Sequence, residues 1–283
     1  MPDWASKWAS CSYRTFTSKH HHKTMFENPD FLKGRLKASG IHLGISLTLA
    51  ILAALLVFLV WYPYPYREIS GGRELFLLLV TVDVIMGPLL TLAIFNRNKP
   101  RKTLQRDLAV IGLLQLSALA YGLWTMAAAR PVHLAFEIDR FRVVHAVDIP
   151  PDMLSRAPAD LQQLPLTGPT LLSVRDFKDA KENFDATMAA LQGVALGARP
   201  DLWQSYEKAK PQVLARARPL AELKTRFPDH TGDIDRALQS ASASARPGAA
   251  IGYIPMVGRS TFWTVLIDAN TAEVIAFVPL DSF

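Results

Sequence analysis

Apolar residues in this 283-residue chain are concentrated in three long runs within its first half. The runs cover residues 41–61, 75–95 and 108–129, and each holds 21 or 22 residues. A helix needs about 20 apolar residues to cross the hydrocarbon core of a bilayer, although one such run is also found as a buried helix in soluble proteins. Three runs joined by short polar loops predict three transmembrane helices, and loops this short predict that the helices pack as one bundle.

The pattern changes after residue 129. The stretch HLAFEIDRFRVVHAV, residues 133–147, alternates apolar and polar positions and predicts a β-hairpin or one long bent strand. Near the end, IGYIPMV, TFWTVLI and EVIAFV predict three further strands separated by turns. The tract SASASARPGAA, residues 240–250, predicts a linker or an exposed loop.

Between these strands, apolar residues at spacings of three and four predict helices. The three sets are Phe177, Ala180, Phe184, Met188 and Leu191; Leu202, Tyr206 and Ala209; and Leu220, Leu223 and Phe227. Pro211 is expected to stop or kink the second helix. The predicted fold class is therefore a membrane protein with a tail over residues 1–40, three transmembrane α-helices within residues 41–129, and an outer α+β domain over residues 130–283.

Basic side chains indicate the orientation of the bundle. Seven Lys or Arg residues precede the first run and five lie between the second and third runs, but only Arg67 and Arg73 lie between the first and second. Basic residues favour the cytoplasmic side, so the tail and the second loop are predicted inside and residues 130–283 outside. Residues 1–129 carry 14 basic and 7 acidic side chains, and residues 130–283 carry 17 and 18. Topology thus accounts for the net charge of +6, and no nucleic-acid partner is predicted.

Sequence signatures of common catalytic, nucleotide and metal sites are missing from the chain: it contains no GxxxxGK[ST], GxGxxG, HExxH or GxSxG. The single cysteine, Cys11, lies in the tail, so no disulfide is predicted outside. The run His20, His21 and His22 is interpreted as part of a flexible tail, and the residues before Met25 as an upstream extension. We predict no catalytic residue, no cofactor and no metal.

Asp83 is the only Asp, Glu, Lys or Arg in any of the three runs, within VTVDVIMGPLL at residues 80–90. A charged side chain near the centre of a membrane helix costs roughly 3 kcal/mol, and it usually faces a hydrogen-bond donor, other parts of the protein or water. It either bonds another helix of the bundle or meets a polar group on a partner's membrane helix. Gly87 and Pro88, one turn deeper, would expose a backbone carbonyl and let another helix approach closely. The candidate donors in the chain are Ser46, Thr48, Gln115 and Ser117.

Several of these segments are similar to a known family. They are RLKASGIHLGISL at residues 35–47, WYPYPYREISGGRELFLLLVTVDVIMGPLLTL at 61–92 and RDLAVIGLLQLSALAYGLWTM at 106–126, followed by ARPVHLAFEIDRFRVV and GRSTFWTVLIDANTAEVIAFVPLD. In these segments the chain resembles the TfpX/TfpZ family of type IV pilin accessory proteins. The resemblance implies a multi-pass protein of the bacterial inner membrane with a periplasmic domain, and a non-enzymatic role in assembling or maintaining type IV pili.

The resemblance makes the major type IV pilin the expected partner, within the lipid bilayer. We expect Asp83, Gly87 and Pro88 to contact the membrane helix of the pilin while the outer domain contacts its head. Arg67 and Glu68, in the outer loop, are further candidates for partner binding. Two alternatives stay open: an interaction subunit of another envelope complex, and a membrane enzyme that uses Asp83 with Tyr62, Arg67 or Glu68.

Overall fold

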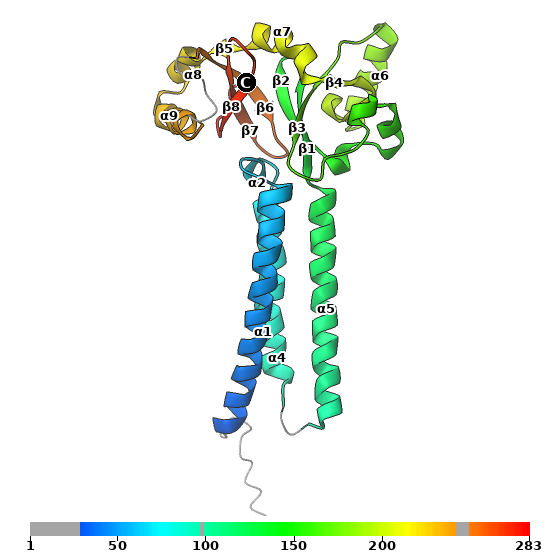
Figure 1. Cartoon of the computed structure of the whole chain (residues 1–283), viewed down its shortest axis with the longest axis vertical. Coiled ribbons are helices and arrows are strands. Elements are labelled where there is room, and N and C mark those ends of the chain that lie inside the picture. Colours follow the sequence, from blue (N-terminus) through cyan, green and yellow to red (C-terminus); the bar gives the residue numbers. More distant parts are fainter. Residues whose placement is uncertain (1–28, 97–98, 242–248) are drawn as a thin grey trace, which may run out of the picture.

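A computed structural model describes residues 29–96, 99–241 and 249–283 of the chain. It consists of a stalk of three long helices that carries a head built on a β-sheet (Figure 1). The predictions for residues 1–24, including the three consecutive histidines and Cys11, lie outside the described residues. So does most of the predicted linker at 240–250.

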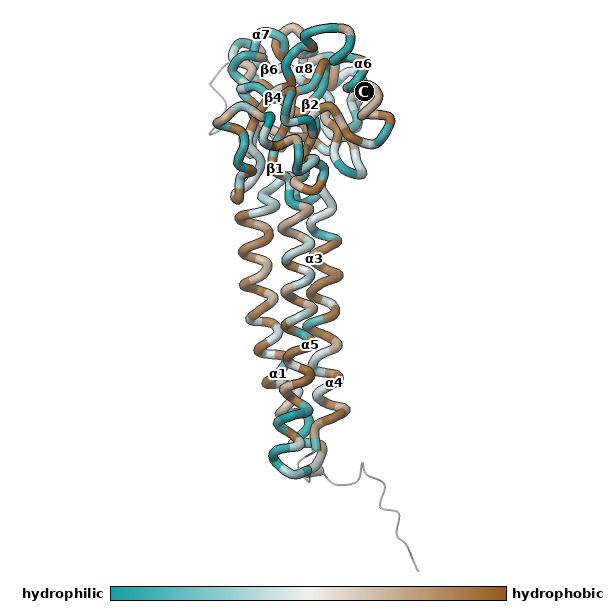
Figure 2. Tube along the Cα trace, turned by 90° about the vertical axis from the view of Figure 1, so that its right-hand side faces the viewer, coloured by the Kyte–Doolittle hydropathy of each residue, from teal (hydrophilic) through white to brown (hydrophobic). Residues whose placement is uncertain are grey.

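The helices of the stalk confirm the three predicted runs as helical. They are α1 (Pro29–Leu55) with a π-helical turn at Leu56–Trp61; α3 (Gly72–Thr81), a π-helical turn at Val82–Met86 and α4 (Gly87–Ile94) in one continuous rod; and α5 (Arg101–Ala128). Within the described residues, three stretches are long and apolar enough to cross a membrane: Leu32–Trp61, Gly72–Ile94 and Arg101–Ala128. Figure 2 shows hydrophobic residues along most of the stalk and hydrophilic ones at its lower end.

The first helix begins well before the expected start at residue 41. The preceding segment, PDFLKGRLKASG, is polar but contains Leu, Lys, Arg and Ala, all good helix formers. The predicted span began at residue 41 because the residues before it are polar. Their helix propensity nevertheless lets the helix begin at Pro29.

The head contains one mixed sheet with the strand order β4-β3-β1-β2-β6-β7-β8, and β5 pairs with β6 outside this path. The strands are β1 (Pro131–Glu137), β2 (Arg140–His145), β3 (Thr170–Val174), β4 (Trp203–Ser205), β5 (Arg218–Pro219), β6 (Ile251–Val257), β7 (Phe262–Asp268) and β8 (Val274–Val278). The predicted hairpin is confirmed as the antiparallel pair β1–β2, and the three predicted final strands are the antiparallel series β6–β7–β8. Strands β1 with β3 and β2 with β6 pair in parallel.

Helices of the head lie between these strands in sequence, as an α+β domain requires. They are α6 (Ala180–Leu191), α7 (Tyr206–Arg216), α8 (Leu220–Arg226) and α9 (Thr231–Ser240). Of the stop or kink expected at Pro211, the stop is wrong, because α7 continues through it to Arg216. Tyr206, Ala209 and Val213 on that helix are buried in the main core, and this packing outweighs the lost hydrogen bond.

The apolar stripe that predicted α6 is largely uncovered. Phe184 is 63% exposed and Leu191 is 77% exposed, whereas Ala186 on another side of the helix is buried. Helical periodicity therefore located α6 correctly but did not indicate which face packs against the head.

Head and stalk are joined through the short helix α2 (Tyr66–Ile69), which lies in the loop between the first two spans. Tyr66 and Ile69 are buried in the same core cluster as strand residues of the sheet. Gly258, just after β6, packs so closely on Ile69 that a Cβ would lie 2.4 Å from its Cγ2 atom. The loop of the stalk is thus part of the core of the head, and the two parts form one continuous structure.

Candidate functional site

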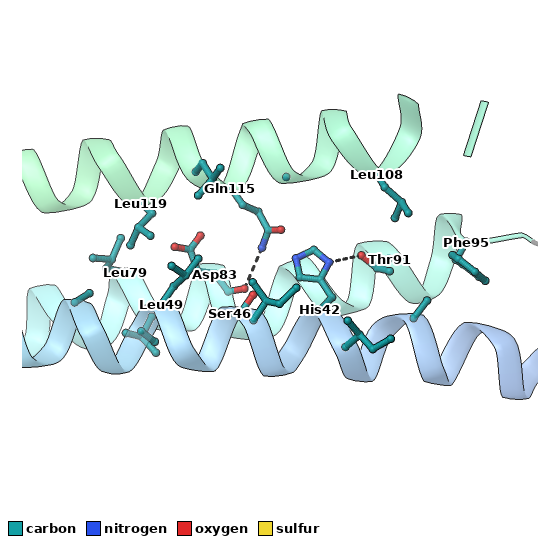
Figure 3. Close-up of a pocket in the computed structure, with 18 of the residues that line it drawn as sticks. His42, Ser46, Leu49, Leu79, Asp83, Thr91, Phe95, Leu108, Gln115 and Leu119 are labelled. Carbon is teal, nitrogen blue, oxygen red and sulfur yellow. Dashed lines mark hydrogen bonds between the residues drawn. The ribbon is translucent and has the colours of Figure 1, made fainter. Parts of the chain in front are cut away.

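Helices α1 and α5 stand apart from each other in the stalk (Figure 1). A long groove runs between them, with α3 and α4 as its floor (Figure 3). Its cavity volume is about 570 Å³. Apolar side chains dominate its walls, and the polar members are few: Lys37, His42, Ser46, Asp83, Thr91 and Gln115. Small residues such as Ala38, Ala50 and Gly112 leave the helix backbones accessible from the groove.

The groove is closed at the end that lies nearer the head. Its lining ends at Ala53 and Leu79, which also belong to an apolar cluster formed by all three helices. There α5 meets α3 so closely that a Cβ on Gly122 would lie 2.3 Å from the Leu79 Cδ1 atom. The opposite end reaches Phe95 and Leu108, near the loop between α4 and α5. The groove therefore opens away from the head.

Asp83 lies in this groove, on the π-helical turn between α3 and α4. Its carboxyl points into the space between α1 and α5 (Figure 3). The residue is only 8% exposed, and its Oδ1 atom finds no hydrogen-bond partner among the residues that the structure describes. The chain thus buries an acceptor without satisfying it, which is costly and unusual in proteins.

Of the four donors expected from the sequence, Gln115 comes close to Asp83 but bonds a different atom. Its Nε2 atom donates to the backbone carbonyl of Asp83 at 3.1 Å. In a π-helical turn the amide five residues later would donate to that carbonyl, and this residue is Pro88, which has no N–H. Gln115 therefore replaces the donor that Pro88 lacks. Its own Oε1 atom is buried and has no partner within the described part of the chain.

The other expected donors are placed differently. Ser46 lines the groove, Thr48 donates to the carbonyl of Gly44 on its own helix, and Ser117 is exposed.

Gly87 and Pro88 are buried contacts within the stalk. A Cβ on Gly87 would lie 1.8 Å from Gln115 Nε2, so glycine makes room for the glutamine. The carbonyl of Pro88 accepts a hydrogen bond from the Ser39 hydroxyl on α1 at 2.9 Å. The exposed carbonyl and close helix approach expected at this pair are thus used by the chain's own α5 and α1. Whether a partner also contacts the pair stays a prediction.

Polar side chains of α1 form a series of hydrogen bonds with α4, here called the polar ladder, which the sequence did not lead us to predict. Arg35 Nε donates to the carbonyl of Phe95 at 2.7 Å, and His42 Nδ1 lies 2.6 Å from Thr91 Oγ1. Ser39 completes the ladder through its bond to α4. A signal was present, because Arg35, Ser39, His42 and Ser46 recur at spacings of four, three and four on one helix face.

The remaining candidates lie at the junction with the head. Arg67 and Glu68 pair with each other at 3.5 Å, and Arg73 lies 3.7 Å from the same carboxylate. Tyr62 is fully buried and its hydroxyl donates to the carbonyl of Met126 at 3.0 Å; burial raises the pKa of this phenol to about 12 and keeps it neutral. None of these side chains lines the groove with Asp83. Within the described ranges, no three His, Cys, Asp or Glu side chains gather as a metal site would require.

Comparison with known proteins places the chain among proteins of fimbrial assembly. The family described as fimbrial assembly protein FimB matches residues 30–71. The chain is 39% identical over 250 residues to the fimbrial assembly protein of serogroup I from Dichelobacter nodosus, covering 87% of this chain and 95% of that protein. It is 36% identical over 249 residues to the serogroup E1 protein of the same organism, with 87% and 95% covered.

A shorter relative, the fimbrial assembly protein of serogroups C1 and C2, is 46% identical over 121 residues, which are 43% of this chain and 92% of that protein. No solved structure matches the chain at a significant level. The length and identity of the first two alignments are sufficient to establish kinship along most of the molecule, stalk and head together. The chain belongs to the family of fimbrial assembly proteins.

Proposed function

We propose that this protein is a non-enzymatic, chaperone-like accessory factor of the bacterial inner membrane that holds the major type IV pilin before or during its assembly. Membership of the fimbrial assembly family supports the role in fimbrial biogenesis. The segments that resemble the TfpX/TfpZ family support the major pilin as the proposed partner. The distribution of basic residues favours a cytoplasmic amino terminus and a periplasmic head.

The observation that carries this proposal is the buried junction between stalk and head. A pilin awaiting assembly presents two different parts, an apolar membrane helix and a globular head. Tyr66 and Ile69 fix the membrane loop in the core of the sheet, so binding sites on stalk and head keep a constant separation. Two weak contacts held in one molecule raise the effective concentration of the second contact and still allow release.

A membrane enzyme is the less favoured candidate on geometric grounds. Its reacting groups would be Asp83 with Tyr62, Arg67 or Glu68, but the last three do not line the groove that holds Asp83. The Tyr62 hydroxyl is already engaged with Met126, and Arg67 with Glu68. An interaction subunit with another client remains the competing class, and its client is what the experiment must identify.

Photo-crosslinking in the native host tests the proposal. A photoreactive residue replaces Phe184 on the exposed side of α6 in one variant and Leu116 in the groove in another. Capture of the major pilin from at least one position, identified by mass spectrometry, is the expected result. If neither probe captures pilin while the protein is present in the inner membrane at its normal level, the accessory role is wrong.

A further inference from the structure

The groove contains a pair of unsatisfied groups of the same kind. Asp83 Oδ1 and Gln115 Oε1 are both buried, and neither has a hydrogen-bond partner within the described residues. Gln115 Oε1 can only accept a hydrogen bond, and the carboxyl of Asp83 keeps accepting lone pairs whether it is ionised or protonated. The two residues face the same groove from α3–α4 and from α5. Leaving a buried acceptor unsatisfied costs about 1–3 kcal/mol. The chemistry that would complete this site is therefore a hydrogen-bond donor.

From this pair we infer that the groove binds one apolar transmembrane helix of a second protein, and that this helix carries a hydrogen-bond donor at the level of Asp83. The inference deepens the proposed function, on which it rests for the identity of the protein that supplies the helix. The donor is a hydroxyl, an amide or an amine, since each offers a hydrogen to a carboxyl or amide oxygen. A polar side chain on a membrane helix costs the least free energy where it can form a hydrogen bond with such an acceptor.

Shape and position favour a helix as the occupant. The lining on α1 extends from Gly34 to Ala53, which at 1.5 Å per residue is about 28 Å, comparable to the hydrocarbon thickness of a bilayer. A volume of 570 Å³ along that length cannot enclose a whole helix, but it accepts the ridge of side chains from a helix lying along its mouth. Small residues in the walls, including Ala38, Ala50 and Gly112, permit the close approach on which helix association in membranes depends.

A lipid acyl chain is the other occupant that suits an apolar groove of this length. It has no hydrogen-bond donor and would leave Asp83 Oδ1 and Gln115 Oε1 as they are. The two acceptors thus decide in favour of the donor-bearing helix, and lipid becomes an outcome of the test.

The test places the same photoreactive residue at two leucines of α5 in the full-length protein, expressed in its native host together with the pilin. Leu116 lines the groove, whereas Leu113, one turn away, is exposed outside its lining. We expect the Leu116 probe to capture an apolar helical segment of a second protein, with a donor residue within about one turn of the cross-link. The Leu113 probe should capture that segment weakly or not at all.

Variants at Asp83 then test the donor. Asp83→Leu should lower the cross-link from Leu116 by about three- to tenfold, the range that one hydrogen bond between membrane helices gives. Asp83→Asn keeps an accepting oxygen and should retain most of the signal. Capture that is indifferent to Asp83→Leu, a captured segment without a donor, capture of lipid alone, or capture of only a second copy of this chain would each overturn the inference. Protease resistance equal to that of the parent shows that a variant is folded.

These outcomes also separate the inference from the proposed function. If the probe at Phe184 captures pilin while the groove yields only lipid, the inference fails and the accessory role stands. If the groove holds a donor-bearing helix of another protein and pilin is captured nowhere, the inference stands and the assignment of pilin as client fails.

Discussion

Replacing Gly258 with alanine tests whether the head is fixed to the stalk as tightly as the contacts of α2 indicate. A Cβ at this position would lie 2.4 Å from Ile69 Cγ2, 2.7 Å from the carbonyl oxygen of Thr261 and 3.1 Å from the carbonyl oxygen of Ile69. The Thr261 carbonyl accepts a hydrogen bond from the Gly258 amide at 2.9 Å, so it cannot rotate away as a side-chain atom would. Overpacking of this kind costs about 1–3 kcal/mol.

Hydrogen exchange followed by mass spectrometry on the full-length protein in detergent or nanodiscs measures this cost. We expect the amides of α2 and of the turn between β6 and β7 to exchange about 5- to 150-fold faster in Gly258→Ala, because a loss of 1–3 kcal/mol raises local opening by that factor. Gly232→Ala on α9 is the matched control. No atom lies within 4 Å of its Cβ position, and alanine is the better helix former. Equal exchange rates in Gly258→Ala and the parent would refute the reasoning about the junction.

Three further changes probe the contacts that hold the molecule together. Tyr62→Phe removes the bond to the Met126 carbonyl, and we expect the end of α5 to lose about 1 kcal/mol of protection in hydrogen exchange; unchanged protection there would contradict the role given to Tyr62. Glu137→Ala removes the acceptor of the buried Gly197 amide, which lies 2.7 Å from Glu137 Oε2, and the carboxylate 2.6 Å from the half-buried guanidinium of Arg142. It should cost about 2–3 kcal/mol in urea unfolding of the full chain, against less than about 0.5 kcal/mol for the exposed Lys181→Ala. Burial lowers the pKa of His133 from 6.5 to about 4, so the unfolded chain takes up a proton below about pH 6.5 that the folded head excludes until about pH 4. This contribution to stability is complete above about pH 6.5 and is lost by about 3 kcal/mol as the pH falls to 4; in His133→Phe the urea midpoint should respond less to pH in that window, and an identical pH response would argue against it.

The helices of the stalk could be predicted from the sequence because their signal is long and uniform. About twenty consecutive apolar residues leave a bilayer-spanning helix as almost the only option for the backbone. The register inside such a helix leaves no comparable signal. An α-helical and a π-helical turn at Val82–Met86 contain the same apolar residues, yet only the second assigns the missing amide of Pro88 to the carbonyl of Asp83.

The head was predictable in class and in its first and last strands, but its pairing was not. Strong alternation marked β1 and β2, and short turns marked β6 to β8. The parallel pairs β1–β3 and β2–β6 join segments separated by long connections, and nothing local in the sequence specifies which strands meet across them. The five residues of β3 are a short apolar stretch, which periodicity alone cannot distinguish from part of a helix or a connector.

Asp83 is the residue for which sequence and structure together say more than either alone. The sequence raised two readings, a bond that holds the bundle or a contact with a partner, and it supplied Gln115 as a donor for the first. In the structure, the side-chain amide of Gln115 donates instead to the backbone carbonyl of Asp83, to which Pro88 has no N–H to donate. Hydrogen bonds of Arg35, Ser39 and His42 join α1 to α4. None of these hydrogen bonds between the described helices includes the carboxyl of Asp83. The carboxyl of Asp83 is expensive to bury and takes no part in those contacts, so a donor-bearing helix that enters the groove explains why it is there. The unpartnered Oε1 atom of Gln115 beside it would also accept a hydrogen bond from such a helix.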